Sequence, residues 1–280
     1  MGTASTVGLL AGIRPTGIAL SALLSTGISL EAAPREYIVL QVPGCQLTIP
    51  WAVNERGDVV GSALSCAGDD QGFAFLYRDG IYTSIDVPGQ IATYPTDINE
   101  RGVVVGYFTT PEHAVGAFTF WRGEFQTISV PGVELVPQGI NNRGDITGWI
   151  PTVSYQAFLL TKNGDFTLLT VDGLEGLQAW KINASGIIVG SAFSPALGIP
   201  VSFVSRRGDS RVAELPGNYS AINDRGDVAA DVQGSGFVIY RMGAPLDLNH
   251  PETGYTIFDL SNRWAVGALP DGRGYLLRLP

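Results

Sequence analysis

The motif Ile-Asn-x-x-Gly-x-x-x-Gly recurs along the chain, and aromatic and charged residues immediately precede several of its copies. Its copies begin at Val53, Ile98, Ile140, Ile182 and Ile222, and a degenerate copy begins at Leu260. The motif repeats, but the two positions before it do not. They hold Trp51-Ala52, Thr96-Asp97, Gln138-Gly139, Trp180-Lys181, Ser220-Ala221 and Phe258-Asp259. Positions that break a repeat are where a site can be built.

The uncharged members of this set, with two neighbouring tyrosines, could bind a ligand at one mouth of a central channel. The predicted ligand-binding residues are Trp51, Tyr94, Gln138, Trp180, Tyr219 and Phe258. The faces of the two tryptophans suit a sugar ring or a flat hydrocarbon. The alternative is that these aromatic rings pack between structural units and line no cavity.

The charged members, Asp97, Lys181 and Asp259, could act as acids and bases. Carboxylates and an amine in a partly dry channel acquire the shifted pKa values that general acid–base catalysis uses. If the protein is an enzyme, we expect these three residues to be catalytic. The alternative is that the three charges satisfy one another.

Motifs for other chemistry are missing from the sequence. It contains no Gly-x-Ser-x-Gly, no His-Glu-x-x-His and no phosphate-binding loop. It has no calcium-loop pattern, and its two histidines and two cysteines are too few and too scattered for a zinc site. We therefore expect no metal site and no cofactor.

The repeat predicts an all-β fold. In each copy, the Asn and the first Gly would supply the positive-φ positions of a hairpin loop, and an apolar run starts the return strand. An aromatic-centred strand and an alternating strand follow. Successive asparagines are 45, 42, 42 and 40 residues apart. Four antiparallel strands per period of this size, without helices, indicate a six-bladed β-propeller.

The two ends of the chain predict how the ring closes. Residues 36–44 match the fourth strand of a blade, whereas residues 274–280 match a third strand with no fourth after it. We expect residues 38–40 to pair antiparallel with residues 275–277, so that the N-terminal strand completes the C-terminal blade and no edge stays exposed.

Several features predict export. Residues 1–33 have the pattern of a cleaved signal peptide, although a disordered N-terminus or an uncleaved anchor is an alternative, and residues 34–280 would form one propeller domain. Cys45 and Cys66 are symmetric about the first hairpin loop and should form a cross-strand disulfide. We expect a secreted protein, extracellular or periplasmic, monomeric and without a membrane span in the mature chain.

The hairpin followed by an Ala-Phe-centred strand resembles the HAF repeat, an extracellular repeat common in bacteria. The resemblance covers residues 36–280 and implies export, a bacterial origin and a propeller-like fold. The histidine that names the repeat is replaced in every copy, so no role of that residue carries over. The replacing residues are Phe73, Gly116, Gln156, Val201, Ser235 and Arg273.

These observations leave three hypotheses for function. The first is a secreted binding module for a carbohydrate or another small organic ligand at the channel mouth, or for an extracellular protein on a face. The second is an enzyme of cyclase, lyase or hydrolase type with its active site in the channel. The third is a structural cell-surface repeat protein. The net charge of −9 argues against nucleic acid and anionic membranes as partners.

Overall fold

The computed structural model describes residues 36–280, apart from 69–71, 152, 207–208, 214–216 and 234. The predicted signal peptide, residues 1–33, lies outside the described residues. The described part of the chain consists of strands, turns and loops, and it includes no helix with the length and hydropathy of a membrane span.

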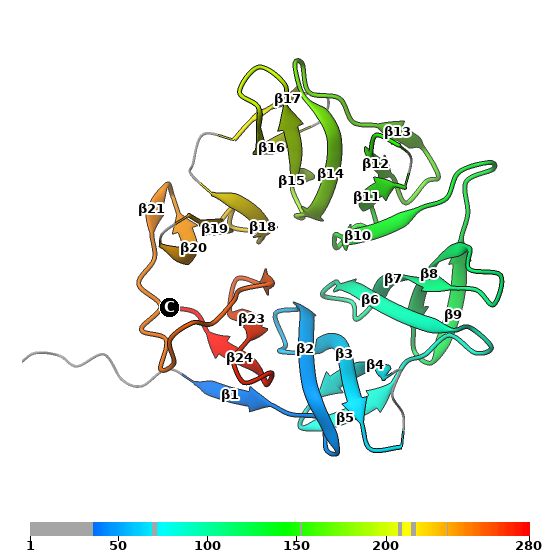
Figure 1. The fold of residues 1–280 in the computed structure, drawn as a ribbon, viewed down its shortest axis with the longest axis vertical. Coiled ribbons are helices and arrows are strands. Elements are labelled where there is room, and N and C mark those ends of the chain that lie inside the picture. The colour runs from blue at the N-terminus through cyan, green and yellow to red at the C-terminus, as the bar shows by residue number, and fades with distance from the viewer. Residues whose placement is uncertain (1–35, 69–71, 152, 207–208, 214–216, 234) are drawn as a thin grey trace, which may run out of the picture. The chain divides into compact units, whose positions relative to one another are not determined.

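The strands form six antiparallel sheets of four strands, the blades of a β-propeller (Figure 1). Blade 1 contains β2 (Cys45–Val53), β3 (Val59–Cys66), β4 (Phe73–Arg78) and β5 (Ile81–Ser84). Blade 2 contains β6 (Ala92–Ile98), β7 (Val104–Thr109), β8 (Val115–Trp121) and β9 (Glu124–Ile128). Blade 3 contains β10 (Val136–Ile140), β11 (Ile146–Ile150), β12 (Gln156–Leu160) and β13 (Phe166–Leu168).

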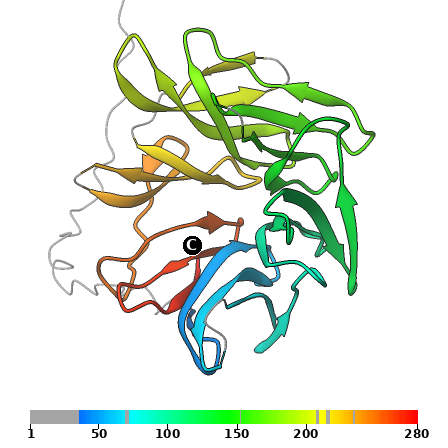
Figure 2. The same ribbon diagram turned by 45° about the vertical axis from the view of Figure 1, so that its right-hand side comes forward.

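Blade 4 contains β14 (Glu175–Ile182), β15 (Ile187–Ser194), β16 (Ile199–Arg206) and β17 (Asp209–Val212). Blade 5 contains β18 (Asn218–Ile222), β19 (Val228–Val232), β20 (Gly236–Arg241) and β21 (Ala244–Pro245). Blade 6 contains β22 (Asp259–Leu260), β23 (Trp264–Ala268), β24 (Gly274–Arg278) and β1 (Tyr37–Leu40). The first strand of each of blades 1 to 5 and β22 of blade 6 are innermost (Figure 1). The predicted six-bladed fold is confirmed (Figure 2).

The second glycine of the motif lets an aromatic ring pack against the second strand. A Cβ atom at Gly61 would meet the carbonyl oxygen of Ile49 and the ring of Phe75. The same relation joins Gly106 to Phe118, Gly148 to Phe158, Gly190 to Phe203 and Gly267 to Tyr275. All five rings are fully buried, so this glycine places the aromatic centre of the third strand in the core.

The motif's asparagine differs from its prediction. The value of φ is positive at Gly57, but Asn54 is not among the residues with positive φ. Instead, Asn54 Oδ1 accepts hydrogen bonds from the backbone N–H groups of Arg56 and Asp58, both at 3.0 Å. The asparagine therefore shapes the loop through its side chain, while the first glycine alone supplies the left-handed backbone.

The same asparagines also join neighbouring blades. Asn54 Nδ2 donates to the backbone oxygen of Asn99 in the next blade, at 3.3 Å. This bond recurs from Asn99 to Asn141, Asn141 to Asn183, Asn183 to Asn223 and Asn223 to Ser261. The spacing of the repeat thus reflects contacts between blades as well as turns within them.

The ring closes as predicted. Strand β1 pairs antiparallel with β24, in a register that places Ile38 opposite Leu276 and Val39 opposite Tyr275. Leu40 is fully buried at this junction. The first and last described strands therefore share one sheet.

The predicted disulfide is also confirmed. Cys45 and Cys66 are directly opposite in the β2–β3 register and are joined by a disulfide. Their sequence separation is 21, and closing a loop of that size stabilises a fold by about 3 kcal/mol in the chain-entropy treatment.

Removing residues 1–42 should abolish cooperative unfolding of the remaining chain. The deletion turns β24 into an exposed edge and uncovers the surface that Leu40 covers, whereas removing only residues 1–35 leaves β1 in place. Thermal unfolding followed by circular dichroism compares the two variants. Equal melting temperatures for both would contradict closure by β1.

Candidate functional site

Each innermost strand of blades 1 to 5 carries a one-residue β-bulge just ahead of the motif, and β14 has a second register shift between Glu175 and Gln178. In blade 1, Pro50 pairs with Gly61 and Ala52 with Val60, which leaves Trp51 unpaired. The unpaired residues of the next four blades are Thr96, Gln138, Trp180 and Ser220. A bulge changes the direction in which a side chain points, so the side chains at these positions can make contacts that the rest of the strand cannot make.

These residues surround one cavity at an end of the channel. All five unpaired residues line it, together with Phe258, the equivalent residue of blade 6. The cavity has a volume of about 420 Å³. The six predicted ligand-binding residues all line it: Trp51, Tyr94, Gln138, Trp180, Tyr219 and Phe258. The structure therefore brings the predicted set together, although Tyr219 is 4% exposed and also packs in the core between blades 4 and 5.

The two tryptophans are held in the same way on opposite blades, 1 and 4 (Figure 1). Trp51 Nε1 donates to Ser62 Oγ at 3.0 Å, and Trp180 Nε1 donates to Ser191 Oγ at 3.1 Å. Because each indole N–H bonds within its own blade, each tryptophan offers the cavity a ring surface and no free donor.

The position after the motif's second glycine is a signal that the sequence analysis missed. It holds Ser62 and Ser191, which anchor the tryptophans, and Tyr107 and Asp231, which line the cavity. Tyr107 stacks on Tyr94, with 4.8 Å between ring centroids. This position varies from blade to blade in the sequence, as the bulge position does.

The residue after each bulge is buried in the middle of the channel, at a level that we call the waist. Lys181 Nζ lies 2.8 Å from Asp97 Oδ1 and 3.4 Å from Asp259 Oδ1. The second carboxylate oxygens accept backbone N–H groups of adjacent blades, from Ile140 at 2.7 Å and from Val53 at 3.0 Å. We call Asp97, Lys181 and Asp259 the charged triad. Its members come from blades 2, 4 and 6, and the one ammonium group contacts both carboxyl groups.

Small residues on the other three blades make room for the triad. Ala52, Gly139 and Ala221 occupy the equivalent positions of blades 1, 3 and 5 and are all buried. A Cβ atom at Gly139 would lie only 2.9 Å from the Cα atom of Lys181. A small residue at position 139 is therefore a packing requirement beside the triad.

The triad separates two hollows. Lys181 borders the aromatic cavity on one side and a hollow of about 50 Å³ on the other. The motif asparagines line the smaller hollow, so it lies toward the hairpin loops.

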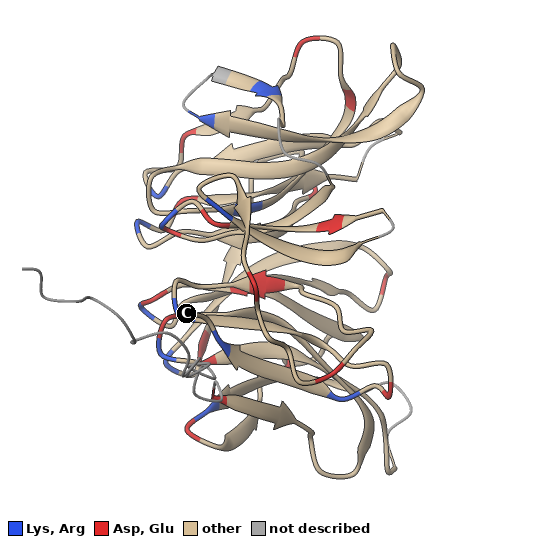
Figure 3. Ribbon diagram, turned by 90° about the vertical axis from the view of Figure 1, so that its left-hand side faces the viewer, with Lys and Arg blue, Asp and Glu red and all other residues tan. Residues whose placement is uncertain are grey.

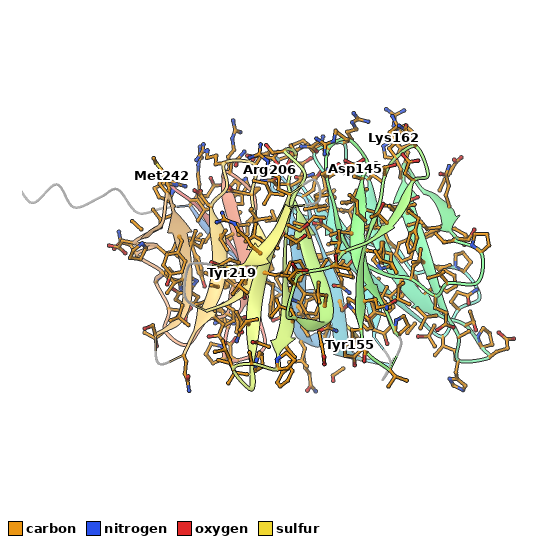
Figure 4. The ribbon with its side chains drawn as sticks, turned by 90° about the horizontal axis from the view of Figure 1, so that it is seen from above. Asp145, Tyr155, Lys162, Arg206, Tyr219 and Met242 are labelled. Atoms are coloured by element: carbon orange, nitrogen blue, oxygen red, sulfur yellow. A yellow bond between two sulfur atoms is a disulfide. The ribbon has the colours of Figure 1, made fainter. Side chains whose placement is uncertain are left out.

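Figure 4 shows Asp145 and Lys162 at the face of these loops, Tyr155 at the opposite face and Tyr219 between them. Lys and Arg gather mainly along one face (Figure 3).

Burial and neighbouring charges shift the pKa values of Lys181 and Asp259. Burial alone lowers the pKa of Lys181, but Asp259 and Asp97 more than offset this and raise it. Burial raises the pKa of Asp259 to about 7, against the attraction of Lys181. The native pKa of Asp259 thus exceeds its ordinary value of 3.8, so its contribution to stability is greatest at acidic pH and is lost as pH rises through about 7.

Comparisons with known proteins support the fold alone. No protein-family model matches the chain, and no curated protein matches it in sequence. TolB from Acinetobacter baumannii has a TM-score of 0.51 and 10% identity, over 87% of this chain and 54% of TolB. A triple arginine-to-alanine mutant of AofleA from Arthrobotrys oligospora has a TM-score of 0.48 and 12% identity, over 86% of this chain and 81% of AofleA. The HAF resemblance stays a prediction.

The lining of the cavity consists of aromatic ring surfaces and a few separate polar groups, and the charged triad lies beneath it. Among the described residues, no group of three or more His, Cys, Asp or Glu side chains is placed to hold a metal ion. Lys181 is the one triad member that lines the aromatic cavity, and its Nζ already contacts both aspartates and donates to the Thr96 carbonyl at 3.2 Å. The arrangement is suited to binding a neutral ligand by stacking and hydrogen bonding.

Replacing Lys181 with Met should destabilise the fold by about 3–5 kcal/mol at pH 8, because two buried carboxyl groups lose their cation. The loss should be much smaller at pH 4, where carboxyl groups can gain protons. Lys162→Met changes an exposed lysine and should alter stability by less than about 0.5 kcal/mol. Urea unfolding measures both variants. An equal loss for Lys181→Met at the two pH values would show that ion pairing is not the cause.

Proposed function

We propose that this protein is an exported carbohydrate-binding module that holds its ligand in the aromatic cavity. One observation carries the proposal: the bulges of five inner strands place the variable residues of the repeat around a single cavity. A binding site explains why the bulge positions differ from blade to blade while the motif that follows them repeats.

The lining of the cavity supports a sugar as the ligand. Trp51 and Trp180 offer indole faces from opposite blades, which suit the apolar faces of sugar rings. Gln138, Asn218 and Asp231 add amide and carboxylate groups that hydrogen-bond hydroxyls. A mostly apolar cavity with a few polar groups is typical of small-molecule sites.

Export is supported by two features. The disulfide between Cys45 and Cys66 is of the kind that persists in oxidising compartments. Residues 1–33 have the composition of a signal peptide. We infer that the mature protein functions outside the cytoplasm, in the periplasm or the extracellular space.

The enzyme hypothesis has less support. A general acid or base needs to reach the substrate, yet Asp97 and Asp259 are 6% and 4% exposed and bond to Lys181 and to backbone groups. The triad has an evident structural role, since its ion pairs connect blades 2, 4 and 6 across the channel. We therefore assign the triad to stability and the aromatic cavity to binding.

Trp51→Ala and Trp180→Ala should each weaken glycan binding by roughly tenfold to a hundredfold, as expected when a central aromatic contact is truncated. Trp121→Ala is the matched control, because Trp121 is 46% exposed and does not line the cavity. A glycan array followed by calorimetry measures the effect.

A second pair of variants separates binding from catalysis. Asp97→Asn should reduce binding only as far as it reduces the folded fraction, and Lys181→Met, which changes a residue that borders the cavity, should weaken binding without abolishing it. If they instead removed turnover of a bound glycan while binding persisted, the protein would be an enzyme. Full binding by both tryptophan variants would refute the cavity as the site.

A further inference from the structure

Two grooves extend the aromatic cavity toward the rim of the propeller. The first lies between blades 1 and 2, has a volume of about 270 Å³ and shares Tyr94 with the cavity. The second lies between blades 4 and 5, has a volume of about 580 Å³ and shares Asn218 and Asp231 with the cavity. The three hollows are therefore neighbours, joined by common side chains.

The two grooves leave the cavity in opposite directions. In a ring of six blades, the junction of blades 1 and 2 is opposite the junction of blades 4 and 5 (Figure 1). The tryptophans of the cavity come from blades 1 and 4, one beside each groove. The hollows therefore follow one line across the face of the propeller.

The groove walls continue the apolar lining of the cavity. Ile91 is 40% exposed in the first groove, and Ile199 and Val212 are 52% and 46% exposed in the second. Asp231 is an exposed carboxylate that borders both the cavity and the second groove. Exposed apolar side chains beside isolated polar groups suit a ligand with alternating apolar faces and hydroxyls.

We propose that the ligand is a linear oligosaccharide of several rings, which crosses the face from the first groove through the cavity to the second. This inference rests on the proposed carbohydrate-binding function. The tryptophans stack on the central rings, and the isoleucines of the grooves contact rings further along the chain.

An extended peptide fits the grooves less well. Peptides that bind in grooves of β-proteins commonly add a strand to an unpaired sheet edge. Of the strands beside the two grooves, β3, β4, β16 and β19 are paired on both edges, whereas β6, β17 and β18 are paired on one. Most backbone groups beside the grooves are therefore used within the blades, which leaves mainly side-chain surface for a ligand.

The test is the dependence of affinity on chain length. Soluble oligosaccharides of one to eight units, prepared from the polysaccharides that bind best on a glycan array, are titrated by calorimetry. Affinity should rise with length beyond two units, because each added ring gains contact in a groove. Equal affinity for two and eight units would overturn the inference and leave the cavity as a site for a small sugar.

Three isoleucine variants locate the added contacts. Ile91→Ala and Ile199→Ala should each weaken binding of the longest oligosaccharide by roughly fivefold, and should leave binding of two-unit sugars unchanged. Ile81→Ala is the control, since Ile81 is 67% exposed and lies outside both grooves. If length dependence survives both groove variants, the chain does not follow this line.

The outcomes separate this inference from the proposed function. If no glycan of any length binds, the carbohydrate-binding function fails and the inference fails with it. If short and long sugars bind equally and the tryptophan variants abolish binding, the function stands and the extended path is wrong. Binding of extended peptides with the same dependence on Ile91 and Ile199 would instead assign the path to a protein partner.

Discussion

The structure depends on a lysine buried at the centre of the ring. Lys181 reaches from blade 4 to carboxylates on blades 2 and 6, and those carboxylates bond to the backbone of blades 3 and 1. A buried charge is tolerated only when it is paired and hydrogen-bonded, so these five blades must keep a fixed separation. Gly139 follows from this constraint, because a Cβ atom there would lie 2.9 Å from the Cα atom of Lys181, and the equivalent residues Ala52 and Ala221 are also small and buried.

In blades 1 to 5, the bulge of the inner strand separates the buried residues around the triad from the variable residues that line the cavity. The extra residue lines the aromatic cavity, and the residue after it is buried at the waist. A change at Trp51 or Trp180 can therefore alter the cavity without disturbing the triad. This division lets one fold keep a constant framework while its binding surface varies from blade to blade.

Much of this architecture could be predicted from the sequence, because the repeat encodes it locally. The Gly-Phe pairing, the spare strand at residues 38–40 and the symmetric cysteines each have a short-range or register signal. The role of Asn54 was predicted wrongly: its φ is not positive, and its side chain instead bonds to the loop backbone and to the next blade, 45 residues away. The bulges were not predicted, although the prolines before Trp51, Thr96 and Gln138 are a signal for them. Whether the charges paired or faced a ligand depended on distances across the ring, which the sequence does not contain.

Fluorine NMR of the protein labelled with 5-fluorotryptophan tests the central claim most directly. The chain has five tryptophans, of which Trp51 and Trp180 line the cavity, while Trp121, Trp149 and Trp264 do not. Single Trp→Phe variants assign the five resonances. A saturating glycan from the array should shift the resonances of Trp51 and Trp180 and leave the other three unchanged. Shifts at Trp121 or Trp264 without shifts at Trp51 and Trp180 would contradict the assignment of the binding site to the bulge residues.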